Sequence, residues 1–106
     1  MDNINFKKSV DEQSRVTKLE MGGMLVLENS EYLKNELVVA VGELSNKVLI
    51  EVKNVQEIDL ACIQLILALI RFLDDHHISY QFSWRLSEEH QTLLENVGFG
   101  NELFLN

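Results

Sequence analysis

Cys62 is the strongest potential nucleophile in this sequence, because a thiolate reacts readily in covalent catalysis. Activation of the thiol would require a neighbouring base or a lowered pKa. Cys62 instead lies in the run from Leu60 to Leu73, where only Gln64 and Arg71 interrupt the apolar residues. Burial in such a run disfavours the thiolate, so we expect an inert core residue, with a reactive thiol as the alternative.

The best candidates for metal ligands are His76 and His77, which follow Asp74 and Asp75. Adjacent residues after a helix rarely point the same way, and a closed site needs four well-placed ligands. We expect a solvated helix end instead, where cationic imidazoles would favour the negative end of the helix dipole. His90 has no evident partner, so neither a metal nor another cofactor is expected.

Glycine pairs and carboxylate pairs offer no further catalytic arrangement. Gly22-Gly23 and Gly98-x-Gly100 match neither GxxxxGK[ST] nor GxGxxG, so we expect turns rather than phosphate-binding loops. Asp74-Asp75 and Glu88-Glu89 lack the apolar surroundings that would raise the pKa of one carboxyl group. The protein is therefore not expected to be an enzyme.

Composition indicates one globular domain. The 106 residues are 46% hydrophobic and 25% charged, without proline or an internal repeat, so a single domain over residues 1–106 is expected. A net charge of -8 and no evident cluster of Lys or Arg make nucleic acid an unexpected partner. The apolar run is shorter than the roughly 20 residues that span a bilayer, so direct membrane insertion is not expected. One cysteine and no signal-peptide profile favour a cytoplasmic location.

The N-terminal half predicts a hairpin and a helix. Ile4–Val10 and Arg15–Met21 have the composition of two strands, and after the glycine pair Met24–Leu27 is expected to be extended. From Glu31 to Leu44 apolar residues recur at spacings of three and four, which predicts a helix with one buried face. That face holds Leu33, Leu37, Val38, Ala40, Val41 and Leu44.

The second half predicts alternating strands and helices. The nearly continuous apolar run Lys47–Lys53 is typical of a central strand covered on both faces, and a helix is expected over residues 59–75. Ile78–Arg85 alternates as a half-buried strand, and Ser87 would cap a third helix that ends at Gly98. We expect an α/β sandwich with a mixed sheet of four to five strands.

The second helix has an unusual outward side. At 100° per residue Gln64 and Arg71 share a side with Glu57 and Asp75, so this side faces solvent. The same side holds three apolar residues, Leu60, Leu67 and Ala68. The opposite side, which would pack on the sheet, holds Cys62, Ile66, Leu69 and Leu73. An outward apolar side predicts a docking surface, unless the first helix or the C-terminal tail covers it.

Strand Val48–Val52, followed by Asn54–Asp59 and a helix that opens with small and apolar residues, resembles the signature of STAS domains, the anti-sigma-factor-antagonist family. Gly23–Leu27 resembles that family's glycine-marked entry to its first helix, and Leu93–Phe99 resembles its closing helix and turn. The resemblance covers essentially the whole chain after Val16. It implies a STAS-like sandwich and a protein-binding module of bacterial signal transduction.

The resemblance also implies a phosphorylation switch that this sequence lacks. In such domains a Ser or Thr usually follows the aspartate that ends the strand-to-helix loop, and a kinase phosphorylates it to switch the partner. Asp59 matches the aspartate, but Leu60 stands at the phospho-acceptor position and has no hydroxyl group. Cys62 stands where the family commonly has glycine. A displaced phospho-acceptor, Ser87 or Thr92, stays open.

The expected function is a non-enzymatic interaction with a histidine-kinase-like, anti-sigma or other signalling protein. Ile58–Leu65 more closely resembles STAS proteins linked to chemotaxis and other two-component systems than sporulation-type antagonists. Two alternatives stay open: an accessory subunit of a membrane ABC transporter for lipids, and a homodimerising scaffold. The residues expected to bind the partner are Gln56, Glu57, Ile58, Asp59, Leu60, Gln64, Leu67, Ala68 and Arg71, with Asp59 also capping the helix.

Overall fold

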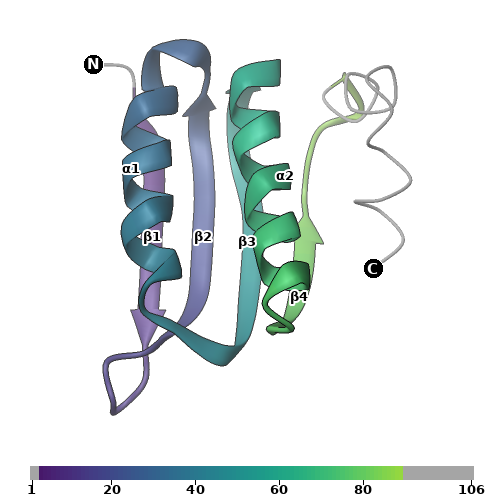
Figure 1. The fold of residues 1–106 in the computed structure, drawn as a ribbon. Coiled ribbons are helices and arrows are strands. Elements are labelled where there is room, and N and C mark those ends of the chain that lie inside the picture. The colour runs from purple at the N-terminus through teal and green to yellow at the C-terminus, as the bar shows by residue number, and fades with distance from the viewer. Residues whose placement is uncertain (1–2, 90–106) are drawn as a thin grey trace.

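The computed structural model describes residues 3–89, which form a sheet with the strand order β1-β2-β3-β4 (Figure 1). The strands are β1 (Ile4–Val10), β2 (Val16–Leu25), β3 (Leu44–Ile58) and β4 (Ser79–Trp84). β1 pairs with β2 antiparallel, which confirms the N-terminal hairpin, whereas the β2–β3 and β3–β4 pairs are parallel. The predicted mixed sheet is therefore confirmed.

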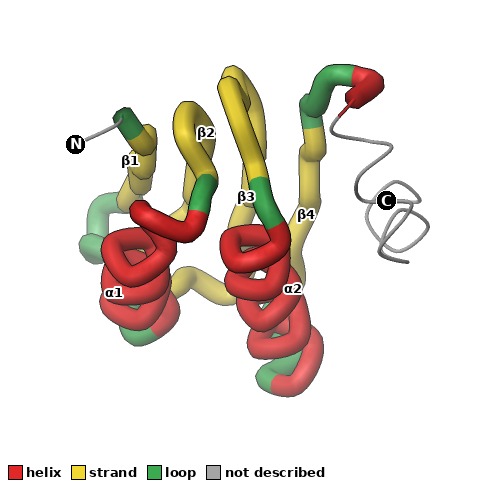
Figure 2. The backbone as a smooth tube through the Cα atoms, turned by 90° about the horizontal axis from the view of Figure 1, so that it is seen from above, coloured by secondary structure: helices red, strands yellow, loops and turns green. Residues whose placement is uncertain are grey.

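Each parallel pair is joined through a helix. A short 3-10 helix, η1 (Leu27–Asn29), leads into α1 (Ser30–Val41), and α2 (Leu60–Asp75) connects β3 to β4. Figures 1 and 2 show that α1 and α2 lie side by side on the same face of the sheet. Crossovers between parallel strands share one hand, so strands added in one direction place their helices on one side.

The core lies between this face and the two helices. On β3, Val48, Ile50 and Val52 are buried, while the intervening Leu49 and Glu51 are only half-buried. Among residues 3–89 both helices lie on one face, so this part of the chain covers the strand on one face only, in contrast to the predicted cover on both faces. β3 is also longer than its apolar run, since backbone pairing with β2 continues as far as Ile58.

Gly22 and Gly23 lie inside β2, so the prediction that they form a turn is wrong. A Cβ atom at Gly22 would overlap the carbonyl oxygen of Lys53 on β3. Gly23 has a φ of 75°, a backbone conformation that residues other than glycine rarely adopt. It lies at a register shift between β2 and β3. The glycines permit a close strand contact, and the expected extended piece Met24–Leu27 divides between the end of β2 and η1.

α1 buries fewer residues than its periodicity predicts. Leu33, Leu37 and Ala40 are buried, but Val38 is 61% exposed, which contradicts its assignment to the buried face. The helix ends at Val41, and Leu44 begins β3 instead of closing the helix. The run from Leu37 to Val41 is apolar at every position, so periodicity alone does not decide which side packs on the sheet.

β4 shows the predicted alternation: Phe82 is buried and Tyr80 and Trp84 are half-buried, whereas Ser79 and Gln81 are exposed. Glu88 and Glu89 are helical, in agreement with a third helix beginning after Ser87. The rest of that helix and the C-terminal tail lie outside the described residues.

Candidate docking surface

Asp59 organises the junction between β3 and α2. Its Oδ1 accepts a hydrogen bond from the backbone N–H of Ala61 at 3.1 Å, which confirms the predicted helix cap. Its Oδ2 accepts a second hydrogen bond, from the N–H of Leu27 at 2.8 Å. One carboxylate thus ties the start of α2 to η1, which follows β2. Both oxygens are engaged within the chain, so the carboxylate holds this region in place.

Two leucines beside this carboxylate face solvent. Leu60, the first residue of α2, is 45% exposed, and Leu27, whose N–H donates to Asp59, is 65% exposed. Large apolar side chains exposed around a fixed helix start are a candidate contact surface. We call Gln56–Leu60 together with Leu27 the β3–α2 corner.

The residues predicted to bind a partner divide by exposure. Six of them are exposed: Gln56, Glu57, Leu60, Gln64, Ala68 and Arg71. Ile58 is only 2% exposed and Leu67 only 6%, so neither offers the surface that was predicted for it. Ile58 belongs to the core at the end of β3, after the stretch Asn54–Glu57, in which the alternation of buried and exposed residues is interrupted. Leu67 is four residues after the buried Ile63, and the rotation of α2 on the sheet carries both inward.

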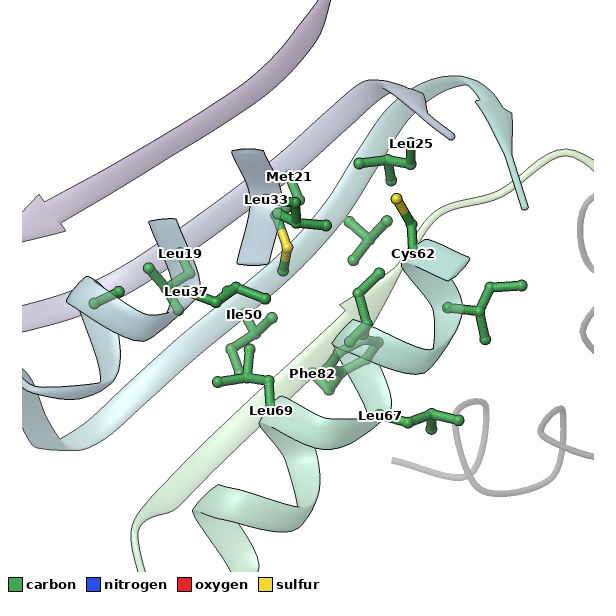
Figure 3. Close-up of a cluster of buried hydrophobic side chains, with 14 of the residues drawn as sticks. Leu19, Met21, Leu25, Leu33, Leu37, Ile50, Cys62, Leu67, Leu69 and Phe82 are labelled. Atoms are coloured by element: carbon green, nitrogen blue, oxygen red, sulfur yellow. The ribbon is translucent and has the colours of Figure 1, made fainter. Parts of the chain in front are cut away.

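The side of α2 predicted to pack on the sheet is confirmed. Cys62, Ile66, Leu69 and Leu73 are all buried, and Figure 3 shows Cys62 and Leu69 among core residues from the strands and α1. The Sγ atom of Cys62 lies 3.6 Å from the carbonyl oxygen of Val26. Burial, with a smaller effect of the Asp59 charge, raises the pKa of the Cys62 thiol to about 12. The thiol is therefore protonated at neutral pH and a poor nucleophile.

The histidines after α2 have contacts within the chain or lie in solvent. His76 stacks on Phe72 with ring centroids 4.0 Å apart, and its Nδ1 lies 2.9 Å from the carbonyl oxygen of Phe72. His76 and His77 are both exposed, as expected for a solvated helix end. Among residues 3–89 no three His, Cys, Asp or Glu side chains are grouped so that they could hold a metal ion.

A groove between α1 and α2 was not predicted from the sequence. Its apolar part has a volume of about 220 Å³ and is lined by Lys34, Leu37, Val38, Val41, Leu65, Ala68, Leu69 and Phe72. It continues toward the helix N-termini as a more polar hollow lined by Ser30, Glu31, Lys34, Asn35, Ala61, Gln64 and Leu65. We call both parts together the interhelical groove. The uninterrupted run Leu37–Val41 is the signal that could have found it.

The candidates for a displaced phospho-acceptor are not equally placed. Ser87 is exposed and immediately precedes the helical residues Glu88 and Glu89. Thr92 lies outside the described residues.

As to the membrane, none of the described helices combines the length and the apolar character needed to cross a bilayer.

The fold and the β3–α2 corner define a class of protein: an α/β domain with a mixed sheet whose capped helix start is exposed. The chain matches the model of the STAS domain over residues 7–105 and therefore belongs to the STAS domain family. STAS domains are generally interaction modules rather than enzymes, and they typically bind protein partners. A comparison with curated proteins found no match.

Proposed function

We propose that this STAS domain acts without a catalytic step, by binding a bacterial signalling protein in the cytoplasm through the β3–α2 corner. The observation that carries the proposal is the 45% exposure of Leu60 at the start of α2. This is the position at which the family resemblance implies a phospho-acceptor. A leucine there favours an apolar contact and cannot receive a phosphate.

The corner has the composition of a small interface. Full burial of a leucine side chain contributes about 1.5–3 kcal/mol, so Leu60 and Leu27 together favour association. The exposed polar residues Gln56, Gln64 and Arg71 would form the rim. Asp59 fixes the backbone on both sides of the contact, so little ordering is required on binding.

The partner in this proposal is a histidine-kinase-like or anti-sigma protein of a two-component or chemotaxis system. Because position 60 cannot be phosphorylated, the contact is constitutive unless another residue takes over the switch. Incubation with ATP and lysate of the native host tests this point. Phosphate on Ser87 or Thr92 that abolishes partner binding would show a displaced switch and contradict a constitutive contact.

The interface is tested by substituting Leu60→Asp in the full chain and measuring affinity for the partner recovered from the native host. We expect a loss of at least about tenfold, because the variant removes apolar burial and requires desolvation of a charge. Val39→Asp is the matched control, since Val39 is also exposed but lies on α1. Unchanged affinity of the Leu60→Asp variant would place the interface elsewhere.

The identity of the recovered partner decides between the proposal and its alternatives. An ATPase with its permease would assign the chain to a transporter instead of a signalling pathway. A dimer at micromolar concentration in gel filtration, dissociated by Leu60→Asp, would identify the corner as a homodimer interface.

A further inference from the structure

We infer that the interhelical groove binds the apolar face of a basic amphipathic helix from a partner protein. The inference rests on the proposed function in one respect: it extends the same docking surface along α2. It names a second contact, and it can fail while the β3–α2 corner still binds.

The lining of the groove supports an apolar occupant. Leu37, Val38 and Val41 of α1 face Leu65, Ala68 and Phe72 of α2 across the hollow of about 220 Å³. Ala68 is exposed and has a small side chain, so it leaves space in the groove between its larger neighbours. Apolar side chains inserted there would remove both helices' apolar surface from water.

Val38 gives the groove an exposed apolar edge. It is 61% exposed and lines the groove, in a run that is apolar from Leu37 to Val41. Val38 therefore adds exposed apolar surface to the groove, and an apolar occupant of the groove would cover it. Valine also has a lower helix propensity than leucine or lysine, so helix formation does not account for its presence.

The groove is continuous with the β3–α2 corner. Its apolar and polar parts share Lys34 and Leu65, and the polar part reaches Ala61 and Gln64, next to Leu60. α1 has 12 residues, which corresponds to a length of about 18 Å. A partner helix of about three turns would fit along it, with apolar anchors at spacings of three and four residues.

Charge selects a basic helix as the occupant. The helical segments η1, α1 and α2 carry five acidic residues and two basic ones. Glu31 and Lys34, which line the groove, offset each other, so the acidic excess comes from the helical surface around the groove, from Glu28, Glu36, Asp74 and Asp75. A partner with Lys or Arg beside its apolar stripe would be attracted to this surface. A second copy docked face to face would oppose acidic residues to acidic residues, which is unfavourable.

The probe is a pair of end-blocked amphipathic peptides of about 14 residues, roughly four helical turns. They share one leucine pattern and carry only Lys or only Glu at the polar positions. Titration into the full, isotope-labelled chain should shift the amide resonances of Val38, Leu65 and Ala68 with the Lys peptide. The Glu peptide should bind at least about tenfold more weakly.

Neutral substitutions locate the contact. Val38→Gln and Ala68→Gln should weaken binding of the Lys peptide at least about tenfold, because each places a polar group in the groove. Val39→Gln is the matched control and should change affinity less than about twofold, because Val39 is 56% exposed but does not line the groove. Equal losses at positions 38 and 39, equal binding of both peptides, or shifts confined to the sheet would overturn the inference.

Two outcomes separate this inference from its alternatives. Concentration-dependent dimerisation that shifts the groove resonances would assign the groove to a second copy and overturn the peptide reading. If the groove variants bind the recovered native partner like the unaltered protein while Leu60→Asp does not, the groove inference fails and the proposed function stands.

Discussion

The two faces of the sheet differ in what covers them. On one face, which α1 and α2 cover (Figure 2), Val48, Ile50 and Val52 belong to the core. On the other face, which we call the open face, ion pairs join neighbouring strands, with 2.8 Å between Lys18 Nζ and Glu51 Oε1. Period-two alternation therefore divides one strand between two environments. Burial stabilises the first face, and partly exposed charge pairs occupy the second.

The same division separates the charges. Five basic and three acidic residues lie on the four described strands, the reverse of the acidic excess on the helical segments. Lys18 and Lys53 both pair with Glu20, which brings cations from two strands together on the open face. A net charge of -8 for the chain conceals this arrangement. The helical side is the acidic and partly apolar one, which is why docking is proposed there.

The largest effect is expected from a pair of substitutions on β3 that compares the two faces directly. Ile50→Ala removes a fully buried side chain and should lower the free energy of unfolding by about 2–5 kcal/mol. Leu49→Ala, one residue away on the open face, should cost about 1 kcal/mol or less. Urea unfolding followed by circular dichroism measures both. Similar losses would mean that something also covers the open face.

An intermediate loss of stability is expected for substitution of Asp59, whose carboxylate accepts hydrogen bonds from η1 and α2 on the helical side. Asp59→Ala removes the acceptor for the N–H groups of Ala61 and Leu27 and should lower the unfolding free energy by about 1–2 kcal/mol. Asp59→Asn keeps a capping oxygen, so it should retain most of this stability. The same unfolding experiment compares them. If the Asn variant loses as much as the Ala variant, the carboxylate charge rather than capping stabilises the junction.

The smallest effect is expected for the ion pairs of the open face. Glu51→Gln should lower the melting temperature slightly at low salt and not at high salt, because ion pairs on a partly solvated sheet face are weak and are screened by salt. Glu12→Gln, in the exposed turn between β1 and β2, is the control. A loss at Glu51 that persists at high salt would show that more than a screened pair acts there.

The stabilisation by the ion pair between Lys18 and Glu51 is confined to a defined pH range. The hydrogen bond from Lys18 lowers the pKa of Glu51 below its ordinary 4.5, and Glu51 raises the pKa of Lys18 above its ordinary 10.5. Stabilisation by Glu51 is present above pH 4.5 and is lost as the pH falls through its lowered pKa. Stabilisation by Lys18 is present below pH 10.5 and is lost as the pH rises through its raised pKa. The loss of stability caused by Glu51→Gln should therefore be largest between these two pH limits.

Several features could be predicted from the sequence because they depend on local rules. The hairpin, the alternation of β4 and the helical period of α2 follow from the spacing of apolar residues. Asp59 is a helix cap because a short carboxylate side chain reaches the first free N–H groups of its own helix. The buried position of Cys62 follows from the apolar run around it. The order of these features also led to the family.

Other features were decided only by tertiary packing. Gly22 looks like a turn residue until β3 is seen to approach it, and the open face of β3 depends on where both crossovers lie. Val38 and Leu67 were assigned to opposite environments from those they occupy, because an apolar helix has no unique buried side by sequence. The rotation of each helix on the sheet is set by contacts distant in the chain. That rotation buries Leu67, leaves Leu60 exposed and opens the interhelical groove, so local spacing could not determine the docking surface.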